Sequence, residues 1–112
     1  MKTIEYPPDK ISLKESEKIM KAHPGRIPVI VVKLHNNLEM KKTKYLVPLD
    51  LHAGQLQYVF RKGLNVSETE SIFMYINDKI LPCSSECVSS LYEQHNVDGF
   101  LKITIARENT FG

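Results

Sequence analysis

The sequence predicts an α+β fold in which two strands, a helix and two further strands form one mixed sheet. Three observations indicate this. Segment 27–34 is rich in β-branched residues, segment 53–62 repeats apolar residues at helical spacing, and segments 71–76 and 100–106 again have the composition of strands. Because a strand that lies parallel to an earlier one needs a crossover, the helix at 53–62 is expected to cover one sheet face.

Length and composition limit the chain to one domain. It has 112 residues, of which 42% are hydrophobic and 25% charged, enough for one core and too few for two ordinary domains. No apolar run approaches the roughly 20 residues that cross a bilayer, and the N-terminus lacks the apolar core of a signal peptide. We therefore expect a soluble, intracellular protein. A net charge of +2 is too small to indicate nucleic acid as a partner.

The cysteines do not indicate a metal site or a catalytic thiol. Cys83 and Cys87 are four residues apart, as neighbours on one helix face would be. The four histidines have no paired spacing that could complete a four-ligand site. Structural thiols are favoured and no cofactor is predicted. An enzyme that uses Cys83 is the least favoured alternative, because the sequence places no histidine beside it.

The first 22 residues are expected to form an arm and a helix that pack on the outside of the domain. Pro7 and Pro8 forbid a continuous helix through the arm. Ser12 and Glu15 match a capping box, which predicts a helix that runs to about Ala22. The main domain is then expected over 23–106, and a flexible tail over 107–112.

The next two segments predict a central strand and a rim strand. Segment 27–34 is almost continuously apolar, which is typical of a strand buried on both faces, and Asn36-Asn37 is expected to turn the chain. A strand over 44–49 carries Pro48, which cannot donate to a ladder and favours the rim of the sheet.

The rim strand is our candidate docking edge for a peptide. Its apolar side chains, Tyr45 to Val47, offer a surface to a guest, and an unpaired edge can accept an added strand. The neighbouring Lys41, Lys42 and Lys44 also fit an ordinary edge that charge protects from aggregation, so both interpretations stand.

The remaining elements follow from helical spacing and turn residues. The helix at 53–62 has one apolar face, formed by Leu56, Val59, Phe60 and Leu64, and Gly63 is its expected stop. A strand at 71–76 ends at an Asn77-Asp78 turn. Ser84 or Ser85 is expected to cap a short helix, and Asp98-Gly99 turns into the last strand. The complete order is that of a ubiquitin-like β-grasp with an N-terminal helical extension.

A series of short blocks in this order resembles the GABARAP-type autophagy ubiquitin-like modifiers. The resemblance extends from about Glu15 to the end without large gaps. The blocks are Arg26-Ile27-Pro28-Val29-Ile30-Val31, Lys44-Tyr45-Leu46-Val47-Pro48, Gly54-Gln55, Arg61-Lys62, Asn77-Asp78, Leu91-Tyr92-Glu93-Gln94-His95, Asp98-Gly99-Phe100-Leu101 and Glu108-Asn109-Thr110-Phe111-Gly112.

The resemblance implies a non-enzymatic modifier whose C-terminal glycine, here Gly112, is joined to the amine of phosphatidylethanolamine on autophagic membranes. A cysteine protease would expose the glycine, and activating and conjugating enzymes would carry it as thioesters. Glycine suits this chemistry because it has no Cβ to obstruct a narrow catalytic channel. The implied location is the cytoplasm and, after lipidation, autophagosomal or vesicle membranes. Whether Gly112 is an encoded end or a trimmed one stays open.

The resemblance also implies a ligand for the rim strand, namely cargo receptors that carry an aromatic-x-x-aliphatic motif. Backbone bonds to Lys44 and Leu46 would set the register of the peptide. One pocket would take the aromatic side chain, between Glu15, Ile19, Pro28, Lys44, Leu46 and Phe100. A second would take the aliphatic side chain, among Tyr45, Val47, Pro48, Leu51, Leu56 and Val59. Acidic residues that flank the motif would be attracted by Arg26, Lys42, Lys44 and Arg61.

Three positions depart from the family pattern. Leu56 stands where a larger aromatic is common, Gly63 replaces a usual basic residue, and His52 stands where Thr or Ser would cap the helix. Ile19, Leu51, Leu56 and Val59 also fit plain core positions. Two further readings stay open: a trafficking adaptor that uses the same groove without conjugation, and conjugation to protein rather than lipid.

Overall fold

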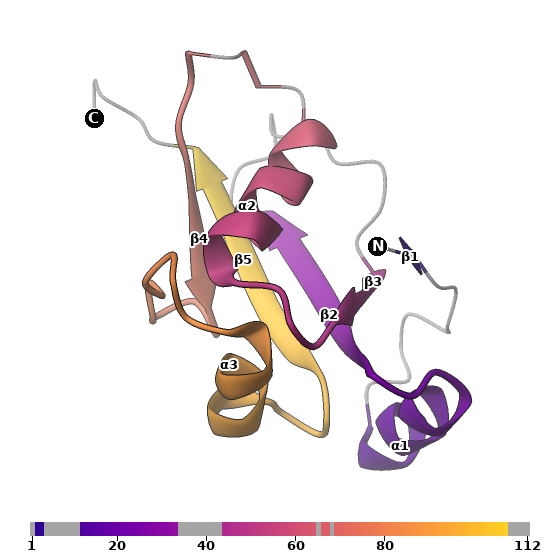
Figure 1. Cartoon of the computed structure of the whole chain (residues 1–112). Helices are drawn as coiled ribbons and strands as arrows, with labels where there is room; N and C mark the ends of the chain where they lie inside the picture. Colours follow the sequence, from indigo (N-terminus) through magenta and orange to yellow (C-terminus); the bar gives the residue numbers. More distant parts are fainter. Residues whose placement is uncertain (1, 4–11, 34–43, 65, 68, 108–112) are drawn as a thin grey trace.

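The computed structural model describes residues 2–3, 12–33, 44–64, 66–67 and 69–107 (Figure 1). Its elements, in chain order, are β1 (Lys2–Thr3), α1 (Leu13–Ala22), β2 (Arg26–Lys33), β3 (Lys44–Pro48), α2 (Ala53–Lys62), β4 (Ile72–Ile76), α3 (Val88–His95) and β5 (Leu101–Arg107). The predicted helix, two strands, helix, strand, short helix and strand are all present. β1 was not predicted.

The strands form one sheet in the order β1-β3-β2-β5-β4. β2 lies in the middle, as its β-branched composition predicted. It pairs antiparallel with β3 and parallel with β5, from Val29 opposite Leu101 to Lys33 opposite Ile105. The parallel pair requires a crossover, and the chain between β3 and β4 supplies part of it as α2. Figure 1 shows α2 and α3 in front of the sheet and α1 at its lower edge.

The main core lies between the sheet and helices α2 and α3. On β4 every second residue is buried, so Ile72, Met74 and Ile76 face the helices. Leu56 and Phe60 on α2 and Val88 and Leu91 on α3 complete the same cluster, each with at most 1% of its surface exposed. At about 25 cal/mol per Å² of buried apolar area, this core is the main source of stability.

A second, smaller cluster joins α1 to the opposite face of the sheet. It contains Ile19 of α1, Leu46 of β3 and Phe100, with Ile30 packed against it. Because successive side chains of a strand point to opposite faces, Leu46 faces α1 while its neighbours Tyr45 and Val47 belong to the main core. α1 thus packs, through Ile19, on the sheet face opposite to α2 and α3.

Ser16 anchors α1 to the turn before β5. Its hydroxyl lies 2.7 Å from the carbonyl oxygen of Asp98 and 2.9 Å from that of Leu13, and the residue is 1% exposed. The turn is tight: Gly99 has a φ of +81°, and a Cβ built on it would lie 2.0 Å from Ser16 Oγ. Glycine is thus required at position 99 both by the backbone and by the approach of α1.

Tyr92 holds the same turn from the α3 side. Its hydroxyl donates to the carbonyl oxygen of Gly99 at 2.7 Å and lies 3.1 Å from Met20 Sδ on α1. Burial raises the pKa of this phenol. The start of α1 is capped as predicted, because Ser12 Oγ accepts a hydrogen bond from the amide of Glu15 at 3.3 Å.

The placement of β3 at the rim was wrong. Lys2 lies opposite Leu46 and Thr3 opposite Tyr45, so β1 adds a short antiparallel strand outside β3. Two residues are too few to show any alternation of polar and apolar side chains, which is why the sequence did not indicate them. The strand itself ends at Pro48, one residue earlier than expected.

Other boundaries also differ. α3 is capped by Cys87 rather than Ser84 or Ser85, and Arg107 is the last residue of β5 rather than part of a tail. β2 is not buried throughout, since Val32 is 38% exposed and Lys33 is also exposed.

The first turn of α2 is stabilised by hydrogen bonds, although the sequence has His52 where Thr or Ser would cap the helix. The side-chain oxygen of Gln55 accepts a hydrogen bond from the amide of His52 at 2.9 Å. The next two amides, of Ala53 and Gly54, donate to the carbonyl oxygens of Glu86 and Ser84 at 2.8 and 2.9 Å. Backbone carbonyls of a neighbouring loop thus replace a Thr or Ser cap.

Gly99→Ala is expected to lower the free energy of unfolding by about 2 kcal/mol or more, because alanine meets both a left-handed backbone and the Ser16 side chain. Denaturant unfolding followed by circular dichroism measures the loss. Gly63→Ala is the matched control: φ is −91° and the nearest atom to an added Cβ is 3.5 Å away, so its effect should stay within about 1 kcal/mol. Equal stability of the two variants would contradict the packing of α1 against the 98–99 turn.

Candidate functional site

The candidate docking site is built on the two faces and the outer edge of β3. Tyr45 and Val47 point toward α2, where the Tyr45 ring lies 5.1 Å from that of Phe60. Burial raises the pKa of Tyr45 above its ordinary value. Leu46 points toward α1. The strand therefore presents apolar side chains on both faces, one set against each helix.

The residues of the first predicted pocket are brought together, and several fill it themselves. Ile19, Leu46 and Phe100 pack on one another with 8%, 0% and 1% of their surfaces exposed. Pro28 is buried opposite Leu46, whereas Lys44 and Glu15 are half-buried. Ile19 is the most exposed of the three apolar side chains, and it belongs to α1 rather than to the sheet.

The second predicted pocket divides into core residues and a partly exposed border. Val47 and Leu56 are fully buried in the main core, and Tyr45 and Leu51 are partly buried against it. Pro48 and Val59 are half-buried. Leu56 therefore packs inside the domain between α2 and the sheet.

The predicted cations lie at several places around this strand. Arg26 begins β2 opposite Pro48, and its Nη1 is buried without a hydrogen-bond partner among the described residues. Arg61 Nη2 donates to the carbonyl oxygen of Ser67 at 2.7 Å, so this guanidinium ties α2 to the following loop. Lys42 and Gly112 lie outside the described residues.

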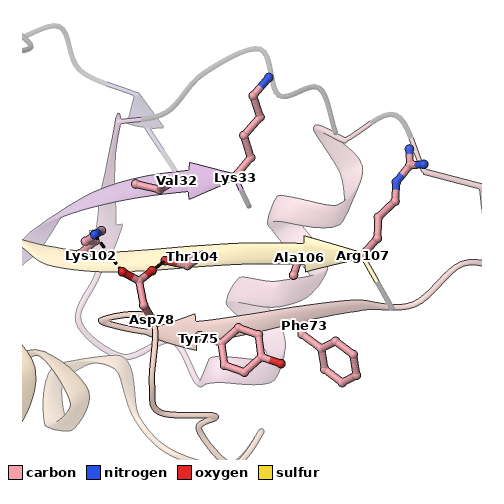
Figure 2. Close-up of a pocket in the computed structure, with 9 residues that line it drawn as sticks. All are labelled: Val32, Lys33, Phe73, Tyr75, Asp78, Lys102, Thr104, Ala106 and Arg107. Atoms are coloured by element: carbon pink, nitrogen blue, oxygen red, sulfur yellow. Dashed lines mark hydrogen bonds and ion pairs between the residues drawn. The ribbon is translucent and has the colours of Figure 1, made fainter. Parts of the chain in front are cut away.

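A second surface, on the sheet face turned away from α2, was not identified from the sequence. Figure 2 shows the rings of Phe73 and Tyr75 side by side on β4, with centroids 6.0 Å apart, along a hollow that also includes Val32. The signal was available: Phe73 and Tyr75 alternate with the buried Ile72, Met74 and Ile76, so two aromatic rings had to face outward.

One end of this hollow carries a polar cluster. The hydroxyl of Thr104 donates to the carboxylate of Asp78, and Lys102 Nζ lies 3.1 Å from Asp78 Oδ2 (Figure 2). The bond from Thr104, followed by that from Lys102, lowers the pKa of Asp78. Both charged side chains are exposed, so the ion pair adds little stability.

The cysteines do not share a helix face, contrary to the spacing argument. Cys83 is exposed in the loop before α3, and Cys87 is the cap of that helix. Cys87 Sγ lies 3.3 Å from the carbonyl oxygen of Leu49 and 3.1 Å from Ser89 Oγ, and the bond with Ser89 lowers the pKa of the thiol. His52 faces Cys87 through a backbone bridge, but its ring nitrogen Nδ1 lies 3.2 Å from the side-chain oxygen of Gln55.

Within the described ranges, no three His, Cys, Asp or Glu side chains gather as metal ligands would. Among the helices described, none is long and apolar enough to cross a membrane.

Comparisons with known proteins agree on one family. Residues 12–112 match the family described as "Autophagy protein Atg8 ubiquitin like". Autophagy-related protein 8 of Schizosaccharomyces pombe is 46% identical over 101 residues, which cover 88% of this chain and 83% of that protein. The Aspergillus niger protein of the same name is 45% identical, with 88% and 85% covered.

Solved structures give the same answer for the fold. Trypanosoma brucei ATG8 superposes with a TM-score of 0.78 and 32% identity, over 96% of this chain and all of that one. Plasmodium falciparum Atg8, solved in complex with a peptide of Plasmodium falciparum Atg3, gives a TM-score of 0.72 and 25% identity, with 83% and 85% covered. The predicted ubiquitin-like fold and family resemblance are confirmed: the chain belongs to the Atg8 family of non-enzymatic, ubiquitin-like autophagy proteins.

Proposed function

We propose that this protein is conjugated through Gly112 to phosphatidylethanolamine on autophagosomal membranes and recruits receptors that carry an aromatic-x-x-aliphatic motif. The position of β3 in the sheet is the observation that supports the recruitment of receptors. The side chains of β3 reach both helix-covered faces of the sheet, and among the described residues its outer edge pairs with β1 at Tyr45 and Leu46. An extended peptide that adds to this edge would find apolar surface on either side.

The two motif residues would enter on opposite faces of β3, because successive residues of an extended peptide point in opposite directions and these two are three positions apart. The aromatic residue would insert between α1 and β3, beside Ile19, Leu46 and Phe100. Since Leu46 and Phe100 are already buried, this insertion requires Ile19 and α1 to shift. The aliphatic residue would contact the half-buried border formed by Pro48, Leu51 and Val59.

Charge supports acidic residues beside the motif. The buried Arg26 Nη1 at the Pro48 end of β3 has no hydrogen-bond partner among the described residues, and a carboxylate of the peptide would satisfy it. Lys44 at the other end would add attraction, and Lys42 is assigned the same role from the sequence. Arg61 would contribute less to this attraction, because its guanidinium already donates a hydrogen bond to the carbonyl oxygen of Ser67.

Conjugation would be a sequence of acyl transfers. Where residues follow Gly112 in the encoded protein, a cysteine protease would first remove them. ATP would convert the Gly112 carboxylate to an acyl adenylate with release of pyrophosphate, and a thiol of the activating enzyme would then displace AMP. The acyl group then passes as a thioester to a conjugating enzyme and finally to the lipid amine. In the last step the carbonyl carbon leaves the thiol sulfur, an amide bond forms to nitrogen, and the amine proton is released. The Atg3 peptide bound to the Plasmodium relative supports a conjugating enzyme as a partner here.

Leu46→Ala is expected to weaken an aromatic-x-x-aliphatic peptide by about 1 to 3 kcal/mol, because it removes one wall of the aromatic pocket. Fluorescence anisotropy with a labelled peptide measures the affinity. Leu91→Ala is the matched control: it also truncates a buried leucine, but on α3, so it should lose comparable stability and keep its affinity for the peptide. Unchanged binding by the Leu46 variant would place the site elsewhere.

Gly112→Ala is expected to abolish lipidation, because a Cβ hinders both the catalytic channel and attack on the thioester. The chain is incubated with the family's activating and conjugating enzymes, ATP and phosphatidylethanolamine vesicles, and the faster-migrating product is measured on a gel. Gly63→Ala, far from the acyl group in sequence, should be lipidated as the parent chain is. Equal yields from the position-112 variant and the parent would refute the role of Gly112, and ladders on the gel would indicate protein targets instead.

A further inference from the structure

β1 occupies the part of β3 that the proposed function assigns to partner peptides. β3 has two neighbours in the sheet: β2 along residues 44–48, and β1 opposite Tyr45 and Leu46. These two residues are at the centre of the docking edge, between Lys44 at one end and Val47 and Pro48 at the other. Any added segment long enough to bridge both pockets must pass this point.

β1 and a partner peptide cannot both pair with this part of β3. An added strand bonds to the amide and carbonyl groups that point outward from β3, and a group already bonded to β1 cannot serve a second strand in the same plane. The competition involves backbone groups, so it does not depend on the identity of the side chains at positions 2 and 3. It applies to every partner that binds by strand addition.

β1, which competes with the partner peptide, belongs to the same chain and is followed in sequence by α1. Ser16 and Tyr92 hold α1 against the 98–99 turn, so only the short connection between Thr3 and Leu13 separates β1 from an anchored element. A short tether raises the effective concentration of a ligand to the order of millimolar. A two-residue strand has few backbone bonds to contribute, so this proximity is what makes its binding competitive.

We propose, on the basis of the docking function above, that β1 is an autoinhibitory strand: Lys2–Thr3 closes the edge of β3 at Tyr45 and Leu46 and must leave before a partner segment adds there. The apparent dissociation constant of a peptide then equals its intrinsic value divided by the open fraction. If β1 is closed in about 90% of molecules, removing it tightens binding about tenfold.

The test compares four forms of the 112-residue chain. They are the parent, a truncation that lacks residues 1–3, the double variant Lys2→Pro/Thr3→Pro and the double variant Lys2→Ala/Thr3→Ala. Neighbouring amides of a strand point to opposite sides, so one of the two prolines removes the donor that faces β3 in either register. The alanine pair changes the same side chains and keeps both donors, which makes it the matched control.

Two measurements are made on each chain. Amide hydrogen exchange, followed by NMR without peptide, reports the closed edge directly: of Tyr45 and Leu46, one amide faces β1 and the other faces β2, so the second is an internal reference. Anisotropy with a labelled aromatic-x-x-aliphatic peptide reports docking. We expect the truncation and the proline pair to exchange about tenfold faster at the β1-facing amide and to bind the peptide about 3- to 10-fold more tightly. The alanine pair should match the parent.

Several outcomes overturn the proposal. Equal exchange and equal affinity in the parent and the truncation would show that β1 does not close the edge. Tightening by the alanine pair as large as that by the proline pair would assign the effect to side chains. Protection that falls on dilution would assign the contact to a second molecule.

If none of the four chains binds the peptide while the exchange difference is present, the docking function fails and the occupancy of the edge by β1 is supported.

Discussion

The fold depends on the parallel pairing of β2 with β5. These strands come from opposite ends of the chain, and the pair joins Val29 through Lys33 to Leu101 through Ile105. Because parallel strands run in the same direction, the chain must return across the sheet between them, and the return includes both α2 and α3. Val29 and Val31 lie opposite Leu101 and Ile103, and all four are buried in the core beneath these helices. β3 is the other neighbour of β2 and pairs with it from Arg26 opposite Pro48 to Ile30 opposite Lys44.

Most of the elements could be predicted because their signals are local. The β-branched run of β2, the helical spacing of Leu56 and Phe60, and the Ser12 cap each need only a few neighbouring residues. Pro48 was expected to lack a strand neighbour on one side, and the two residues of β3 that pair with β1 are Tyr45 and Leu46, not Pro48. Element boundaries were less accurate, as Cys87 and Arg107 show, because caps and strand ends depend on tertiary hydrogen bonds.

The proximity of three candidate residues could be predicted, but their close packing could not. Ile19, Leu46 and Phe100 were expected around one pocket, and they do meet there, yet they fill the space rather than line it. That closure depends on contacts between distant parts of the chain, such as the bond from Ser16 to the carbonyl oxygen of Asp98. β1 escaped prediction for a related reason: a two-residue strand is defined by its partner, not by its own pattern. The outward rings of Phe73 and Tyr75, in contrast, were visible in the alternation of β4 and were overlooked.

The direction of β5 separates α1 from the end of the described chain. Arg107 ends this strand at the opposite end of the sheet from α1, as Figure 1 shows. α1 and the first residues of β2 thus share one end of the sheet, and the described chain ends at the other. The helix that packs on Leu46 and Phe100 is separated from that end by the length of β5.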